Sequence, residues 1–247
     1  MQSRTYDIGF KTNFEHIIPN SDNTQKFTIL YTHGFCSDPW GRKPEEVKKW
    51  CATHHVPFYR YELAGHGSDK ENFEQTDINI YKAQILEIID KYIEGNIVVV
   101  GSSLGGWLSL IAAINRPNRI KGIVGIAAAP DFTVEYMKYI TPAQREEMQK
   151  FGKISYPGQN ITFTITKRLI ESGNENLILD KDVIDINCPV VLVQGMQDVS
   201  VDWHKTLKLA EKIKTQNVKI KLLKNANHRL NEDSDIAEIL SALDTFL

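Results

Sequence analysis

Residues 98–106 read VVVGSSLGG, and this stretch decides the fold. It opens on a short, wholly apolar run, which is typical of a strand covered on both faces of a parallel sheet. A helical pattern over residues 104–115 follows at once. The pattern G-x-S-x-G at Gly101, Ser103 and Gly105 therefore lies between a buried strand and a helix. In that setting it predicts a tight turn that presents the Ser103 hydroxyl at the carboxyl edge of a sheet. A plain glycine-rich turn is the alternative.

The rest of the chain alternates strand patterns with helix patterns. Strands are predicted at 27–32, 56–63, 97–100, 120–129, 190–194 and 218–223, and helices at 44–54, 77–95, 104–115, 204–214 and 234–247. A short hairpin of segments 5–10 and 15–18, with its turn at 11–13, is expected ahead of them. Such alternation predicts βαβ units with right-handed crossovers. The fold class is therefore α/β, with a mostly parallel sheet of about eight strands flanked by helices.

One connection is much longer than the others. Roughly sixty residues separate the strand ending at Ala129 from the strand beginning at Val190, whereas an ordinary connection has ~2–6. Aromatic and methionine residues recur along this segment. We expect residues 130–186 to form a cap of small helices over the sheet edge, inserted into a single domain that spans residues 1–247.

The composition excludes several classes of protein. With 29 basic and 31 acidic residues among 247, the chain has no positive field for nucleic acid. Three widely spaced cysteines without a CxxC pair favour neither disulfides nor a zinc site, and no HExxH or GxGxxG motif indicates a metal or dinucleotide. No stretch approaches the ~18 apolar residues of a membrane helix, and MQSRTYDIGF lacks a signal-peptide core. We expect a cytoplasmic protein with no cofactor, no metal, no nucleic-acid partner and no stable membrane insertion.

A serine hydroxyl needs a base before it can act as a nucleophile. In this kind of sheet the catalytic residues follow the chain order serine, acid, histidine, which leaves His204 and His228 as candidates. His228 lies in a polar turn between the last strand and the last helix, whereas His204 begins a helical pattern. The sequence favours His228.

The acid is expected at the end of a strand between the serine and the histidine. Asp198 follows the strand at 190–194 and would hold the imidazole tautomer. Asp202 is the competitor, although it could instead cap the helix near Trp203. Asp185 precedes its strand and so falls at the wrong edge. The sequence favours Asp198.

Two backbone amides are expected to bind the developing oxyanion. One is that of Leu104, which follows the nucleophile, and the other is that of Phe35, in the loop after the strand at 27–32. Gly34 would let this loop approach closely. Ser102 is the rival nucleophile, but its frame would need glycine where Val100 and Leu104 stand.

These motifs together resemble the α/β-hydrolase superfamily over nearly the whole chain. The motifs are His33-Gly34-Phe35, Gly65-His66-Gly67-Ser68, the turn at 101–105, Asp198 and His228. A closer resemblance, to the palmitoyl-protein thioesterase and acyl-glucuronide esterase branch, rests on VGSSLGGW at 100–107, Asn187-Cys188-Pro189, Gly195-Met196, Trp203-His204 and His228-Arg229. The resemblance implies an α/β-hydrolase fold, a triad of Ser103, Asp198 and His228, and an acyl-enzyme intermediate. The chain departs from the branch at Val199, Asp202 and Glu62.

The expected activity is that of a serine hydrolase acting on small-molecule carboxylic esters or thioesters. Trp40, Phe132 and Met137 are the predicted substrate contacts, because apolar side chains near Ser103 suit an acyl group. Two other hypotheses stay open at this point: a small-substrate amidase or aminopeptidase on the same fold, and a non-catalytic binding module. No motif indicates an oligomeric state.

Overall fold

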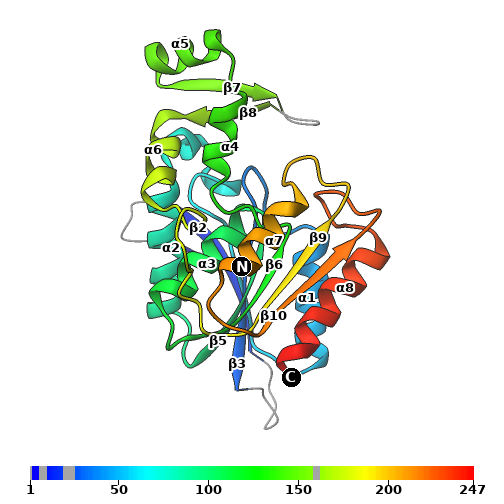
Figure 1. Ribbon diagram of the computed structural model, residues 1–247. Coiled ribbons are helices and arrows are strands. Elements are labelled where there is room, and N and C mark those ends of the chain that lie inside the picture. Colours follow the sequence, from blue (N-terminus) through cyan, green and yellow to red (C-terminus); the bar gives the residue numbers. More distant parts are fainter. Residues whose placement is uncertain (1, 6–9, 19–25, 158–161) are drawn as a thin grey trace.

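The computed structural model describes residues 2–5, 10–18, 26–157 and 162–247. Within them an eight-stranded sheet has the order β1-β2-β4-β3-β5-β6-β9-β10 (Figure 1). Every pair from β4 to β10 is parallel, while β2 runs antiparallel to both β1 and β4. The predicted mostly parallel sheet is confirmed. Its strands are β1 (Gln2–Thr5), β2 (Lys11–Ile17), β3 (Phe27–Thr32), β4 (Phe58–Tyr61), β5 (Asn96–Ser102), β6 (Ile120–Ile126), β9 (Val190–Gly195) and β10 (Val218–Leu223).

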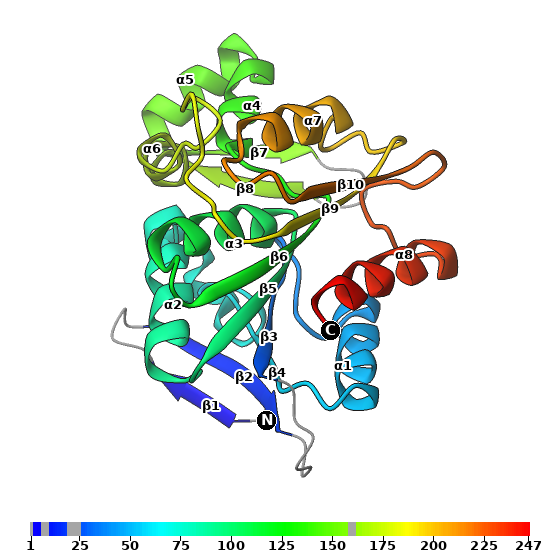
Figure 2. The ribbon, with the colours of Figure 1, turned by 60° about the horizontal axis from the view of Figure 1, so that its bottom comes forward.

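Helices cover both faces of the sheet (Figure 2). One face packs against α1 (Arg42–Thr53) and α8 (Asp233–Leu243). The other packs against α2 (Ile78–Lys91), α3 (Leu104–Asn115) and α7 (Trp203–Lys212). Because successive strand residues point to opposite faces, Val99 joins the second layer while Val98 and Val100 join the first. This double burial is why the strand before the serine is wholly apolar.

The best-patterned helices form where the sequence predicts them. The range 104–115 is that of α3, and the Asp77 carboxylate caps α2 by accepting a hydrogen bond from the Ile80 amide at 2.9 Å. The polar 3-10 segment η1 (Gly67–Gln75) was not predicted, since it has no apolar periodicity.

The N-terminal hairpin exists, but its expected strand limits are wrong. The pairing of Thr5 with Lys11 closes the hairpin, so β2 begins where the sequence analysis expected a turn. Residues 6–9, four of the six residues of the first expected strand, lie outside the described residues. The reason is tertiary: Phe14 pairs with Tyr61 on β4, and alternate residues of β2, Thr12 and Phe14, are buried against the core.

The long connection between β6 and β9, here called the insertion (residues 127–189), rises above the sheet in Figure 1. It contains the expected small helices, together with a two-stranded antiparallel sheet that the prediction of a purely helical cap missed. This sheet forms because Ile154 and Ile165 face each other across the strands and are both buried. The described elements are α4 (Phe132–Tyr139), α5 (Pro142–Phe151), β7 (Lys153–Pro157), β8 (Thr162–Thr166) and α6 (Lys167–Glu175).

Candidate active site

Ser103 occupies a strained turn between β5 and α3. Its backbone angles are φ 55° and ψ −116°, a conformation that side-chain-bearing residues adopt at a cost of about 1–3 kcal/mol. The flanking glycines are required by space: a Cβ at Gly101 would lie 2.2 Å from the Gly105 carbonyl oxygen, and one at Gly105 would lie 2.1 Å from that of Thr32. The strain and the two glycines expose the Ser103 side chain at the sheet edge.

Ser102, the rival nucleophile, has a different environment. It is buried, and its side chain shares a hydrogen bond with the Tyr31 side chain on β3. Ser103, by contrast, is half-buried and lines a cavity.

Asp198 and His228 meet although 30 positions separate them in the chain. The Nδ1 atom of His228 lies 2.8 Å from Oδ2 of Asp198. The carboxylate also accepts hydrogen bonds from the backbone amides of Ser200 and Val201, each at 2.8 Å, and from Nε2 of Gln194 at 2.9 Å. Its side chain is fully buried, so these donors replace water.

The charge of Asp198 follows from these contacts. Burial by itself would raise the pKa of this carboxyl, but the hydrogen bonds from His228, Val201 and Gln194 outweigh burial and hold the pKa below its ordinary value. An ionised Asp198 accepts a hydrogen bond from the Nδ1–H group of His228, which keeps the proton on Nδ1. The Nε2 atom is then left without a proton and can act as a base.

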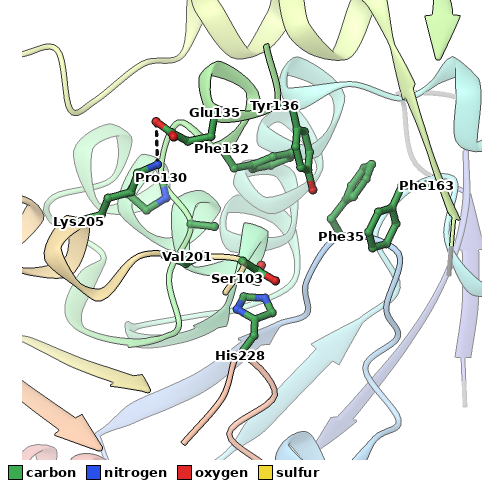
Figure 3. Close-up of a pocket in the computed structure, with 12 residues that line it drawn as sticks. Phe35, Ser103, Pro130, Phe132, Glu135, Tyr136, Phe163, Val201, Lys205 and His228 are labelled. Atoms are coloured by element: carbon green, nitrogen blue, oxygen red, sulfur yellow. Dashed lines mark ion pairs between the residues drawn. The ribbon is translucent and has the colours of Figure 1, made fainter. Parts of the chain in front are cut away.

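Ser103 and His228 line the same cavity, which has a volume of about 150 Å³. Figure 3 shows the imidazole beside the serine hydroxyl. One end of the cavity is aromatic, and the other carries the ion pair of Lys205 and Glu135, whose Nζ and Oε1 atoms are 3.0 Å apart. The aromatic side chains are Phe35, Phe132, Tyr136 and Phe163.

The loop after β3 lies directly against the nucleophile. A Cβ at Gly34 would stand only 3.2 Å from Cβ of Ser103, so glycine allows this approach. Within the described part of the chain, the amides of Phe35 and Leu104 donate no hydrogen bond to the protein. Both amides are therefore available to a ligand at Ser103.

Two buried histidines hold this loop in place. Nε2 of His33 accepts from the Leu63 amide at 2.9 Å, and Nε2 of His66 accepts from the Cys36 amide at 3.1 Å. The Nδ1 atoms lie 2.8 and 3.0 Å from backbone carbonyl oxygens. Burial lowers the pKa of His33 to about 3 and also lowers that of His66, so both rings are neutral. His33 and His66 therefore hold backbone groups of these loops, and neither is among the described residues that line the cavity with Ser103.

The buried carboxylate of Glu62 organises the neighbouring turn. It accepts hydrogen bonds from Nε1 of Trp40 at 3.2 Å and from the Ser68 hydroxyl at 2.6 Å. The Arg60 guanidinium stacks on the Trp40 ring at 4.4 Å from its centroid.

The predicted substrate contacts need correction. Trp40 is held by Glu62 and Arg60, and Met137 packs against the core. Neither is among the described residues that line the cavity with Ser103. Phe132 does line it. The sequence assigned no cavity role to Phe163, although its aromatic side chain in the long connection was a usable signal. It also gave no role to Lys205, because a lysine within a helical pattern carries no signal of a cavity.

The rival base and acid lie elsewhere. His204 and Asp202 form an exposed pair at 2.7 Å, and the Asp202 carboxylate caps α7 by accepting from the His204 amide at 3.0 Å. Asp202 thus has the capping position that the sequence suggested as its other role.

Among the described residues, no group of three or more histidine, cysteine, aspartate or glutamate side chains is placed to bind a metal ion. The same residues contain no helix with the length and apolarity needed to cross a membrane.

The protein belongs to the alpha/beta hydrolase fold family, whose model matches residues 28–151. Among individual relatives, it is 30% identical over 222 residues to palmitoyl-protein thioesterase ABHD10, mitochondrial, of Rattus norvegicus, a match that covers 89% of this chain and 74% of the relative. The resemblance seen in the motifs is confirmed. The name of this relative places it in mitochondria, so the cytoplasmic location expected for this chain stays a prediction.

Solved structures agree with this assignment. Alpha/beta hydrolase domain-containing protein 10 from mouse superposes with a TM-score of 0.88 at 27% identity, covering 99% of this chain and 97% of that one. A putative hydrolase from Agrobacterium vitis S4 superposes with a TM-score of 0.90 at 26% identity, covering 99% and 96%.

Proposed function

We propose that this protein is a serine hydrolase that cleaves carboxylic esters or thioesters through an acyl-enzyme intermediate. One observation carries the proposal: His228 is hydrogen-bonded to the buried Asp198 and lines the same cavity as the strained Ser103. Nucleophilic acyl transfer needs a serine, a histidine beside it that accepts its proton, and an ionised carboxylate that holds the histidine. The thioesterase relatives and the family fold support the same class of reaction.

In the proposed mechanism, Nε2 of His228 accepts the Ser103 proton as Oγ attacks the carbonyl carbon. Asp198 stabilises the resulting imidazolium. The amides of Phe35 and Leu104 bind the oxyanion, each contributing about 2.7–4 kcal/mol to the transition state. His228 then gives its proton to the leaving oxygen or sulfur, and an activated water releases the acid by the same steps.

The cavity favours an apolar acyl group. Phe35, Phe132 and Phe163 present ring surface beside Ser103. Among the described lining residues, the lysine and the glutamate, Lys205 and Glu135, are paired with each other. We propose that residues 130–186 act as a cap that supplies much of this wall, since Phe132, Tyr136 and Phe163 all come from it. A small-molecule ester or thioester with an apolar acyl part fits these features.

The test is labelling by a fluorophosphonate probe, together with turnover of p-nitrophenyl esters of increasing acyl length and of matched acyl thioesters. The wild type should be labelled and should hydrolyse at least one substrate series. Ser103→Ala should lose both properties and keep its melting temperature, whereas Ser102→Ala should still be labelled. A folded wild type that neither labels nor turns over would favour the binding-module hypothesis.

A further inference from the structure

A second cavity lies beside the loop after β3, on the side of α1 and of the loop that carries His228. Its volume is about 390 Å³, within the ordinary range for small-molecule sites. Gly34 and Ser102, which flank Ser103, form part of its wall, and Phe35 and Phe163 line both cavities. The second cavity therefore adjoins the place where the substrate carbonyl would react.

The charges of this cavity are not balanced. Three cations line it, namely Arg42, Lys43 and Arg229, against one carboxylate, Asp38. Arg42 is neutralised by an ion pair with Asp233. Among the described residues, neither Lys43 nor Arg229 has an ion-pair partner, although Asp235 lies near enough to favour the charged form of Lys43.

The positive charges of Lys43 and Arg229 repel each other. Burial, together with repulsion from Arg229, lowers the pKa of Lys43 to about 8. Among the described residues, the Lys43 ammonium donates a hydrogen bond to the backbone carbonyl of Arg229, a neutral group. Two like charges beside a half-buried cavity would be stabilised by an anion between them.

The chemistry of ester cleavage indicates which part of a substrate would enter. A general acid must touch the leaving atom, so the leaving group lies on the His228 side of the carbonyl. Arg229 follows His228 directly, and Asn231 of the same loop also lines the second cavity. The leaving group would thus pass towards the cations while the acyl group stays among the aromatic rings.

We infer that the second cavity binds a phosphate group on the alcohol or thiol part of the substrate, held by Lys43 and Arg229. This inference rests on the proposed function. A guanidinium binds phosphate oxygens in pairs, and an ammonium adds a compact charge, so a dianion suits the two better than a singly charged group. In the reaction, the bond from Ser103 Oγ to the acyl carbon forms, the bond to the phosphorylated leaving group breaks, and that group leaves with the proton from His228. Water then yields the free acid.

The test compares three butanoyl esters that differ only in the leaving group: hydroxyethyl phosphate, neutral methoxyethanol and hydroxypropanoate. At low ionic strength, kcat/KM for the phosphate ester should exceed that for the neutral ester by about tenfold or more, the size of one or two charged hydrogen bonds. Arg229→Gln and Lys43→Gln should each bring this ratio towards one. Lys49→Gln, an exposed lysine on the same helix, should leave the ratio unchanged.

The ratio separates binding from damage to the catalytic loop. Lys43 also tethers that loop through the Arg229 carbonyl, so its loss could slow both esters equally, and the ratio cancels such an effect. Arg229→Gln removes the guanidinium without touching that tether.

Inorganic phosphate provides a second readout, and should inhibit hydrolysis of the neutral ester competitively in the wild type and weakly in Arg229→Gln. Hydrolysis of the neutral ester without preference for phosphate would overturn this inference and leave the proposed function standing. A preference for the carboxylate ester over the phosphate ester would overturn the choice of phosphate. Phosphate binding by a chain that hydrolyses no ester would overturn both the proposed function and the assignment to a leaving group.

Discussion

The buried hydrogen bonds at the carboxyl edge of the sheet and several of the ion pairs that tie the insertion to the rest of the protein differ in their exposure to solvent. At the sheet edge, buried polar groups hold one another: Asp198 accepts four hydrogen bonds, and two neutral histidines fix the loop of Phe35. In the insertion, several polar contacts to the rest of the protein lie in solvent, as in the pair of Lys153 and Glu74, whose side chains are 47% and 48% exposed. Buried networks are costly to disturb, whereas exposed ion pairs contribute little. The groups of the proposed triad are therefore preorganised, and the walls of the cavity can vary around them.

The largest effect is expected at the sheet edge, in Asp198→Asn. The amide can accept from the backbone but presents a donor or a weaker acceptor to Nδ1 of His228, which disfavours the tautomer with a free Nε2. We expect kcat to fall by about 10⁴-fold with the fold retained. Steady-state hydrolysis of a p-nitrophenyl ester, with circular dichroism, measures both. Asp202→Asn, which alters an exposed helix cap, should keep kcat within a factor of about two. Equal losses in the two variants would remove Asp198 from the proposed triad.

The second prediction concerns the close packing beneath Ser103. In Gly105→Ala the new Cβ would lie 2.1 Å from the Thr32 carbonyl oxygen and 2.6 Å from that of His33, so β3 and α3 must separate. We expect a loss of about 3 kcal/mol or more in the free energy of unfolding, at the upper end for overpacking, because backbone atoms cannot rotate away. Urea denaturation measures it. Gly41→Ala is the matched control, since a Cβ there meets nothing within 4 Å and the residue has φ −74°. A stable Gly105→Ala protein would mean that the turn is looser than its contacts indicate.

The third prediction uses the neutral histidines. Their pKa values are lowered in the folded protein, so between the ordinary value of 6.5 and the folded value the unfolded chain binds more protons. Stability is therefore full above that ordinary pKa and falls as the pH decreases below it, by up to about 1.4 kcal/mol per unit for each histidine. Asp131, whose pKa is raised by burial, acts in the opposite direction at lower pH. Denaturation between about pH 7 and 5 should give a shallower slope for His66→Gln and an unchanged slope for His204→Gln. Equal slopes in wild type and His66→Gln would refute this origin.

The same contrast explains how far the sequence could predict the structure. The strand, turn and helix around Ser103 follow from local rules, because burial on both faces demands an apolar run and the turn demands glycine. Asp198 and His228 could be selected because chain order and strand ends restrict the choice. The triad role remains a proposal, but the hydrogen bond between them is present.

Long-range packing was beyond such rules. Nothing local indicates that Trp40 stacks on Arg60, since that contact depends on how β4 lies beside the loop after β3. The strands β7 and β8 form because two isoleucines meet across them, a pairing that a search for helices in the insertion would pass over. Lys205 enters the cavity only because α7 lies beside α4.

The smallest effect is expected where the two regions meet, in Glu135→Gln. Glu135 lies on α4 of the insertion and pairs with Lys205 of α7, and both side chains are 26% exposed. Burial would raise the pKa of Glu135, but the hydrogen bonds from Lys138 and Lys205 outweigh it and hold the pKa below its ordinary value, so the pair is charged at neutral pH. Partial exposure allows water and salt to screen the attraction, so its loss should cost less than about 1 kcal/mol of stability.

Because this pair borders the cavity and is not part of the proposed triad, the change should appear in KM, by about two- to threefold, with kcat preserved. Thermal denaturation at low and high salt, together with steady-state kinetics, separates the two quantities. Glu147→Gln on α5, an exposed residue outside the cavity lining, should alter neither. A loss above about 2 kcal/mol, or a fall in kcat alone, would mean that the insertion is coupled to the sheet edge as tightly as the sheet edge is to itself.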